Sequence, residues 1–225
     1  NITIDVGASN KAEVEKMGIH VGCVITYEDE LMILNKKFYT GRALDNRLGG
    51  FMIAEVARLV KESKTKLPFG LYICNSVQEE VGLHGATMIA QTIRPDVAII
   101  TDVTHDTSTP LIDAKQEGDV RLGLGPALTY APSVHRKLLQ LIEEAAQVNN
   151  IPFQRVASSR STGTDTDAFA YANGGIPSAL ISIPLRYMHT TVEMAHFEDI
   201  SHLINLISAS LQQIKSGHNF KYFDR

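Results

Sequence analysis

Several short apolar runs in the sequence each end in a carboxylate or a histidine. Residues 97–102 form one run that closes on Asp102, and residues 180–188 form another that His189 follows directly. Continuous apolar runs of this length are typical of strands buried on both faces of a parallel sheet. Segments with helical periodicity separate the runs from residue 45 onward. This alternation predicts an α/β fold, with a mixed, mostly parallel sheet and helices on both of its faces.

The expected elements follow from these two periodicities. From residue 45 onward they are helices over 46–62, 85–93, 133–149, 165–172 and 197–215, strands over 69–77, 97–102, 153–158 and 178–183, and a glycine-rich hairpin over 111–129. The first forty residues are more polar and richer in strand patterns. There we expect a strand over 2–6, a helix over 10–17 with Ser9 as its N-cap, and two or three strands within 21–37.

The overall composition excludes several classes of protein. The chain has 225 residues and a formal net charge of -4, so no basic excess points to nucleic acid. No apolar stretch has the length of a transmembrane helix, so we expect no membrane partner. The two cysteines, Cys23 and Cys74, form neither a metal-binding pair nor a disulfide framework. We therefore expect one sizeable domain with a small appendage, located in the cytoplasm.

Two adjacent carboxylates, Glu79 and Glu80, stand between the expected strand 69–77 and a glycine turn. Adjacent residues of a strand point to opposite faces, so the pair serves one surface only if the strand ends there. One interpretation is an ordinary exposed turn. The other is a metal site, because buried charges are rare unless they are paired or bind a metal. In that site one carboxylate would bind the ion and its neighbour would accept a proton from water.

Three further residues have a structural and a functional interpretation. Asp45 precedes an apolar, alanine-rich helix, where aspartate is a favoured N-cap but could also bridge two metal ions. Asp102 is either a loop cap or a ligand at the carboxyl edge of the sheet, where ligands collect. His189 alone would more commonly be structural. Together, oxygen ligands and an imidazole suit Zn²⁺, Co²⁺ or Mn²⁺, and two ions sharing one carboxylate would explain why so many acids converge.

Two other places invite a substrate-binding interpretation. Residues 161–167 combine hydroxyl groups and acids just before an expected helix. Thr164 or Asp165 could cap that helix, or Gly163, Thr164 and Asp165 could form a wall of a substrate pocket. Arg186, three residues before His189, could favour acidic side chains of a substrate or could pair with a structural carboxylate. Both alternatives stay open for each place.

Five ordered motifs resemble one known family and together cover nearly the whole chain. They are residues 43–47 (ALDNR), 78–86 (QEEVGLHGA), 102–105 (DVTH), 163–165 (GTD) and 184–189 (PLRYMH). These motifs resemble the dinuclear-metal aminopeptidases of the tetrahedral type, which include glutamyl, lysyl and deblocking aminopeptidases. Some members were once called endoglucanases. The resemblance implies two divalent ions, Zn²⁺ or Co²⁺ with Mn²⁺ as an alternative, short peptides as substrates, and homo-oligomers from dimer to dodecamer.

The resemblance also implies a role for each matching residue. Asp45 would bridge the two metal ions. Glu80 and His189 would complete one metal site, and Asp102 would serve the other. Glu79 would be the general base that activates water for attack on the first peptide carbonyl and then passes the proton to the leaving amine.

One ligand of the family is missing from the sequence. The family has a further histidine in a His-x-Asp motif upstream of the bridging aspartate, with a β-rich domain inserted between them, and no His-x-Asp precedes Asp45 here. We therefore interpret residues 1–40 as the C-terminal part of that inserted domain and 41–225 as the catalytic domain of a longer protein. One alternative is a non-catalytic remnant of the fold. A glycoside hydrolase using Glu79 and a second acid is less favoured, because such enzymes need two separated acids and usually no metal.

Overall fold

The computed structural model describes residues 3–64 and 66–223, and its main sheet has four strands in the order β3-β6-β4-β5. These strands are β3 (Ala98–His105), β4 (Ala127–Tyr130), β5 (Gln154–Ala157) and β6 (Ser178–Leu185). The β3–β6 and β4–β5 pairs are parallel, whereas β4 runs antiparallel to β6. The prediction of a mixed, mostly parallel sheet is confirmed.

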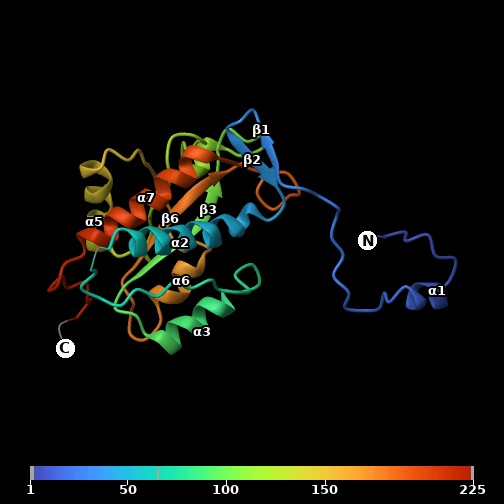
Figure 1. Ribbon diagram of the computed structural model, residues 1–225, viewed down its shortest axis with the longest axis horizontal. Helices are drawn as coiled ribbons and strands as arrows, with labels where there is room; N and C mark the ends of the chain where they lie inside the picture. Colours follow the sequence, from blue (N-terminus) through green and yellow to red (C-terminus); the bar gives the residue numbers. More distant parts are fainter. Residues whose placement is uncertain (1–2, 65, 224–225) are drawn as a thin grey trace.

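Helices cover both faces of this sheet, as predicted. On one side α2 (Leu44–Glu62), α5 (Arg136–Val148) and α7 (Phe197–Gln213) pack on one another and on the sheet. On the other side α3 (His84–Ile93) and α6 (Asp165–Ala170) form a second layer, and Figure 1 shows this pair below the sheet. Two short helices, α1 (Lys11–Lys16) and α4 (Ala114–Glu117), lie outside these layers. The described helices include none that is long and apolar enough to span a membrane.

A second, smaller sheet joins parts of the chain that are distant in sequence. Its three antiparallel strands are β1 (Met32–Leu34), β2 (Phe38–Gly41) and β7 (Glu193–His196), with β2 in the middle. In the register of β2 and β7, Gly41 lies opposite Glu193. The described residues from 3 to about 27, including α1, extend away from the rest of the molecule (Figure 1).

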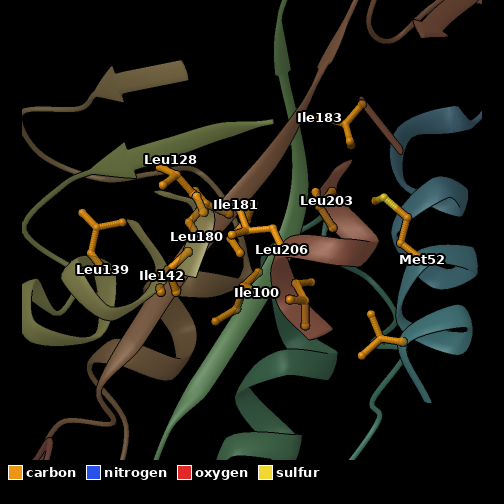
Figure 2. Close-up of a cluster of buried hydrophobic side chains, with 14 of the residues drawn as sticks. Met52, Ile100, Leu128, Leu139, Ile142, Leu180, Ile181, Ile183, Leu203 and Leu206 are labelled. Atoms are coloured by element: carbon orange, nitrogen blue, oxygen red, sulfur yellow. The ribbon is translucent and has the colours of Figure 1, made fainter. Parts of the chain in front are cut away.

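The hydrophobic core is centred on β6. All eight residues of β6 are buried, because the strand has neighbours on both edges and helices on both faces. Figure 2 shows Ile181 and Ile183 of this strand beside Met52 of α2 and Leu203 and Leu206 of α7. Full burial of each such side chain stabilises the fold by about 1.5–3 kcal/mol. This packing fixes α2 and α7 against the sheet.

The predicted strand over 69–77 is wrong for the described structure. The segment is extended but pairs with no other strand of the part described. Residues 68–76 and 78–80 line a cavity of about 1170 Å³, together with Val97 and residues 98–102 of β3, an edge strand. A strand requires a hydrogen-bonded neighbour. The segment therefore has the apolar composition of a buried strand without the partner that would make it one.

Several other boundaries differ from the predictions. The strand over 97–102 continues to His105, so Asp102 lies inside it, and residues 111–129 contain α4 and β4 instead of a hairpin. The strands expected before residue 32 do not form; of the predicted strand 2–6, residue 2 lies outside the described part. Asn10 caps α1 in place of Ser9, accepting a hydrogen bond from the backbone of Glu13. The sequence patterns did not predict β7, whose short strand depends on pairing with β2.

Candidate metal centre

Asp45 lies at the start of α2, where the chain turns sharply from β2 into the helix. Ala43 has a left-handed backbone (φ 57°), and Asp45 and Asn46 have non-helical dihedral angles, joined by a cis peptide bond. The side-chain amide of Asn46 donates to the carbonyl of Thr101 in β3 (2.9 Å) and accepts from the backbone N–H of Gly49 (2.8 Å). These bonds fix the start of α2 beside β3, and the Asp45 carboxylate is almost fully buried there.

His189 reaches Asp45 from the loop between β6 and β7. Its Nε2 lies 3.1 Å from Oδ2 of Asp45 and 3.5 Å from Oε2 of Glu80. Glu80 comes from the turn after segment 69–77, in which the backbone N–H of Gly82 donates to the carbonyl of Glu79 (3.0 Å). One ligand atom from each of Asp45, Glu80 and His189 lies within 4.8 Å of the other two. Three segments distant in sequence thus bring together three of the predicted ligands.

The other two predicted acids, Asp102 and Glu79, lie near this group. Asp102 is 7% exposed, and its carboxylate accepts a hydrogen bond from the backbone N–H of Val103 (2.8 Å). Burial, with additional repulsion from Asp45 and Glu79, raises the pKa of Asp102 to about 8. Burial, together with repulsion from Asp165, Glu80 and Asp45, raises the pKa of Glu79 to about 7. Asp102 is not part of the group of three, although its charge and that of Asp45 repel each other.

The chemistry of the group fits a divalent cation. Burial and the charges of Glu80 and Glu193 raise the pKa of Asp45 to about 6, against the opposing effect of His189. A cation would offset this concentration of negative charge. Carboxylate oxygens and imidazole nitrogens are both zinc ligands, and catalytic zinc sites combine three protein ligands with one open position. The side chains of Glu80 (56% exposed) and His189 (64% exposed) leave the group accessible to solvent.

The residues predicted to line a substrate pocket lie around the start of α6. Thr164 is buried and caps α6, accepting from the backbone N–H of Thr166 (3.2 Å). Gly163 has a left-handed backbone (φ 68°), and its N–H donates to Asp167 (3.0 Å). Asp165 accepts a short hydrogen bond from the hydroxyl of Ser76, and burial raises its pKa. Of the three, Asp165 is the residue whose charge acts on Glu79.

Arg186 makes a structural ion pair. Its Nε donates to Oδ2 of Asp106 (2.7 Å), a fully buried carboxylate, and its Nη2 donates to the hydroxyl of Ser108 (2.9 Å). Although burial opposes it, hydrogen bonds from Ser108, Arg186 and Leu122 together lower the pKa of Asp106. The guanidinium is thus fixed beside β3, and this geometry corresponds to the structural alternative for Arg186.

Two residues of the site region could not be found from local sequence patterns. Glu193 is 2% exposed and accepts hydrogen bonds from the backbone N–H groups of Asp45 (3.1 Å) and His189 (2.8 Å). Its position four residues after His189 was the available signal, but nothing local indicated its burial. Ser76, the donor to Asp165, had no signal beyond its place before Glu79.

Comparisons with known proteins identify a family and several relatives. The family model of the M42 glutamyl aminopeptidases matches residues 1–206. The lysyl aminopeptidase of Pyrococcus furiosus is 36% identical over 220 residues, which are 96% of this chain and 60% of that protein. Aminopeptidase APDkam598 from Desulfurococcus kamchatkensis has a similar structure, with a TM-score of 0.85 and 34% identity over 93% of this chain and 58% of that chain.

A third similar protein is a Pyrococcus horikoshii peptidase that can assemble into a tetrahedron or a large octahedral shell. Its TM-score is 0.75, with 28% identity over 91% of this chain and 59% of that chain. These relatives are named as aminopeptidases or peptidases. The chain belongs to the M42 glutamyl aminopeptidase family, as its resemblance predicted, and it spans about 60% of the length of the relatives it matches.

Proposed function

We propose that this chain supplies the catalytic centre of a metal-dependent aminopeptidase that removes N-terminal residues from short peptides. The observation that carries the proposal is the convergence of Asp45, Glu80 and His189 beside Glu79 in a member of an aminopeptidase family. In this proposal residues 41–225 are the catalytic domain and residues 1–40 are the tail of an inserted β-rich domain.

Asp45, Glu80 and His189 would hold one divalent ion, with Zn²⁺ or Co²⁺ as the first candidates and Mn²⁺ as an alternative. Asp45 and Asp102 would hold a second ion, with Asp45 shared between the two. When bound, such ions supply Lewis-acid activation of water and of the peptide carbonyl. Among the described residues we assign two ligands, Asp102 and Asp45, to this second ion. Because the chain spans about 60% of the length of its relatives, we infer that the rest of such a protein would complete the second site.

Glu79 would act as the general base. Glu79 is adjacent to Glu80 in the chain but is not one of the three grouped residues. The charges of Glu80 and Asp45 both act on its carboxylate. A carboxylate with a pKa of about 7 can accept a proton from water and return it to the leaving amine at neutral pH. Burial and the neighbouring acids, Asp165 first among them, bring the pKa of Glu79 into that range.

Gly163, Thr164 and Asp165 are proposed to border the peptide, with Asp165 nearest the base. Arg186 would also lie near the substrate, because it stands three residues before His189 in the chain. Its charge is nevertheless paired with Asp106. We further propose a homo-oligomer, because a related peptidase can assemble into a tetrahedron or a large octahedral shell. A reducing, cytoplasmic location would suit the two free cysteines.

The test is zinc binding to the purified chain, measured by elemental analysis after loading with Zn²⁺, followed by hydrolysis of aminoacyl-anilides. We expect His189→Ala to lose bound zinc and His20→Ala, which changes an exposed histidine, to retain it. Equal zinc in both variants would refute the assignment of His189. Activity is measured on the complete protein, meaning one that spans the full length of the relatives, of which this chain covers about 60%.

A non-catalytic remnant is the second candidate, and the two-ligand second site is the observation that favours it. This candidate requires that the complete protein, free of other peptidases, releases no N-terminal residue from any aminoacyl-anilide. A third candidate, a glycoside hydrolase, is disfavoured because the imidazole of His189 lies between the carboxylates of Asp45 and Glu80. Hydrolysis of a glucan in the presence of a chelator would be the result that supports this candidate.

A further inference from the structure

A buried carboxylate that belongs to none of the predicted roles lies directly behind the metal group. Glu193 is the first residue of β7 and is 2% exposed. Among the described residues, no lysine, arginine or histidine forms an ion pair with it. Burying a carboxylate without a cationic partner is costly unless hydrogen bonds to the charged form offset the lost hydration. Such a residue therefore needs a specific reason to be where it is.

The hydrogen bonds of Glu193 supply that reason. One oxygen accepts the backbone N–H of Asp45 (3.1 Å), and the other accepts the backbone N–H of His189 (2.8 Å). We propose that Glu193 is the positioning residue of the metal centre, clamping the two ligand-bearing segments, the start of α2 and the β6–β7 loop, at a fixed separation. This inference rests on the proposed function, because it assigns Asp45 and His189 as ligands.

The hydrogen bonds to Glu193 stabilise two turns whose backbone conformations are unfavourable by themselves. His189 has a left-handed backbone (φ 61°), and so has Ala43, two residues before Asp45 (φ 57°). Such conformations in non-glycine residues cost about 1–3 kcal/mol and persist only where surrounding contacts impose them. The N–H groups of Asp45 and His189 both point at one carboxylate, so a single side chain satisfies two donors in two strained turns.

Glu193 is itself held rigidly. It lies opposite Gly41 in the β2–β7 pair, and the next residue, Met194, exchanges two backbone hydrogen bonds with Arg186 (both 3.0 Å). Arg186 in turn is fixed by its ion pair with Asp106. The clamp is thus built on paired backbone, which explains how a loop residue such as His189 can be placed within 3.1 Å of a side chain at the start of α2.

A carboxylate is required in this position and an amide is not equivalent. A carboxylate has two accepting oxygens, whereas glutamine has one and would turn an NH₂ group toward a backbone donor. The chain contains a matched case away from the metal group. Asp199 is fully buried and accepts the backbone N–H groups of Gly123 (2.7 Å) and Gly125 (2.8 Å). Asp199→Asn therefore makes the same chemical change at a second clamp.

The experiment compares Glu193→Gln with Asp199→Asn by two readouts. The first is Zn²⁺ affinity, measured by titration calorimetry on the 225-residue chain. Partners that orient metal ligands typically contribute about 10–100-fold to metal affinity, so we expect Glu193→Gln to weaken Zn²⁺ binding by that factor. We expect Asp199→Asn to leave the affinity unchanged within twofold, although it also removes a buried carboxylate.

The second readout needs no metal. Amide hydrogen exchange in the chelator-treated chain should be at least about tenfold faster for Asp45 and His189 in Glu193→Gln, because their acceptor is lost. In Asp199→Asn the faster amides should be Gly123 and Gly125 instead. If Glu193→Gln fails to fold by circular dichroism, Glu193→Asp replaces it. Aspartate keeps the charge but is one methylene shorter, so it should protect one of the two amides and not both.

Two results would overturn the proposal. One is a Glu193→Gln variant in which the amides of Asp45 and His189 exchange at unchanged rates. The other is an Asp199→Asn variant that loses as much Zn²⁺ affinity as Glu193→Gln, which would trace the effect to general stability. If the unmodified chain binds no Zn²⁺, the proposed metal centre fails by itself, and the exchange rates decide whether Glu193 holds the two segments.

Discussion

Asp102→Asn should make the metal-free protein more stable, because Asp102 is a buried acid whose charge is opposed by its surroundings. Its pKa is raised from 3.8 to about 8, first by burial and then by Asp45 and Glu79. A carboxyl group with a raised folded-state pKa contributes its full share of stability below the unfolded pKa, near 4, and loses it as the pH rises through the folded pKa, near 8. Asparagine does not titrate and escapes this loss.

The magnitude follows from the size of the shift. Each pKa unit corresponds to about 1.4 kcal/mol, so the loss between pH 5 and pH 8 is at most about 4 kcal/mol. We expect about half of that, ~2 kcal/mol, because the repulsion from Asp45 and Glu79 can relax by small side-chain movements. Asparagine also keeps an oxygen to accept the backbone N–H of Val103, so no hydrogen bond needs to be lost. For a domain of this size, ~2 kcal/mol raises Tm by about 4–8 °C.

The assay is thermal unfolding by circular dichroism in chelator, at pH 5 and pH 8. The Tm advantage of Asp102→Asn should be largest at pH 8 and small at pH 5. The matched control is Asp106→Asn, which should have the opposite sign. The pKa of Asp106 is lowered, so its charge stabilises the protein above the unfolded pKa, and the variant should lose stability at pH 8. Saturating Zn²⁺ should shrink the advantage of Asp102→Asn, because a cation offsets the charge that the substitution removes.

An Asp102→Asn variant that is no more stable than the unmodified chain at pH 8 would refute this reasoning. Equal effects at pH 5 and pH 8 would also refute it, because they would trace the change to packing or to hydrogen bonding instead of charge.

Three further predictions test other parts of the structure. Glu79→Gln in the complete protein should lower kcat for aminoacyl-anilide hydrolysis by about 10²–10⁴-fold with bound metal unchanged by elemental analysis, and near-normal turnover would show that Glu79 is not the base. Gly85→Ala should markedly lower the free energy of unfolding, because a Cβ there would lie 2.4 Å from the carbonyl oxygen of Val77. Gly50→Ala, whose Cβ meets nothing closer than 3.5 Å, should instead stabilise α2 by about 0.5–1 kcal/mol, and urea unfolding measures both variants. Ile181→Ala should cost about 2–5 kcal/mol in the same urea measurement, because the side chain is fully buried in the central strand, and a cost below 1 kcal/mol would contradict the described core.

The sequence predicted the elements whose pattern of apolar and polar residues directly indicates which positions are buried. β6 is apolar except at Ser178 and Ser182 because it is buried on both faces, and α5 has the periodicity of a helix with one buried side. The start of α2 could also be located, since Asp45 precedes an uninterrupted helical pattern. These features are local in sequence, so composition and periodicity are enough to find them.

The sequence could not predict features that depend on tertiary partners. Segment 69–77 has a strand-like pattern but lies beside a cavity instead of another strand, so its composition alone misassigned it. β7 is only four residues long and exists because β2 lies next to it. The same limit applies within the site: the alternatives for Arg186 differ only in whether a carboxylate lies within reach, and Asp106 is 80 residues away in the chain.

The acids of the proposed metal centre lower the stability of the metal-free fold. Asp45, Glu79 and Asp102 all have raised pKa values, and burial is the first cause for each. A sequence selected only for stability would place amides or apolar side chains at these positions. Carboxylates at these positions are explained if the folded protein binds a cation. The negative charge that destabilises the metal-free site would then bind the ion. Metal affinity and pH-dependent stability should therefore change together when these residues are altered, and Glu193 should affect affinity through geometry rather than through direct ligation.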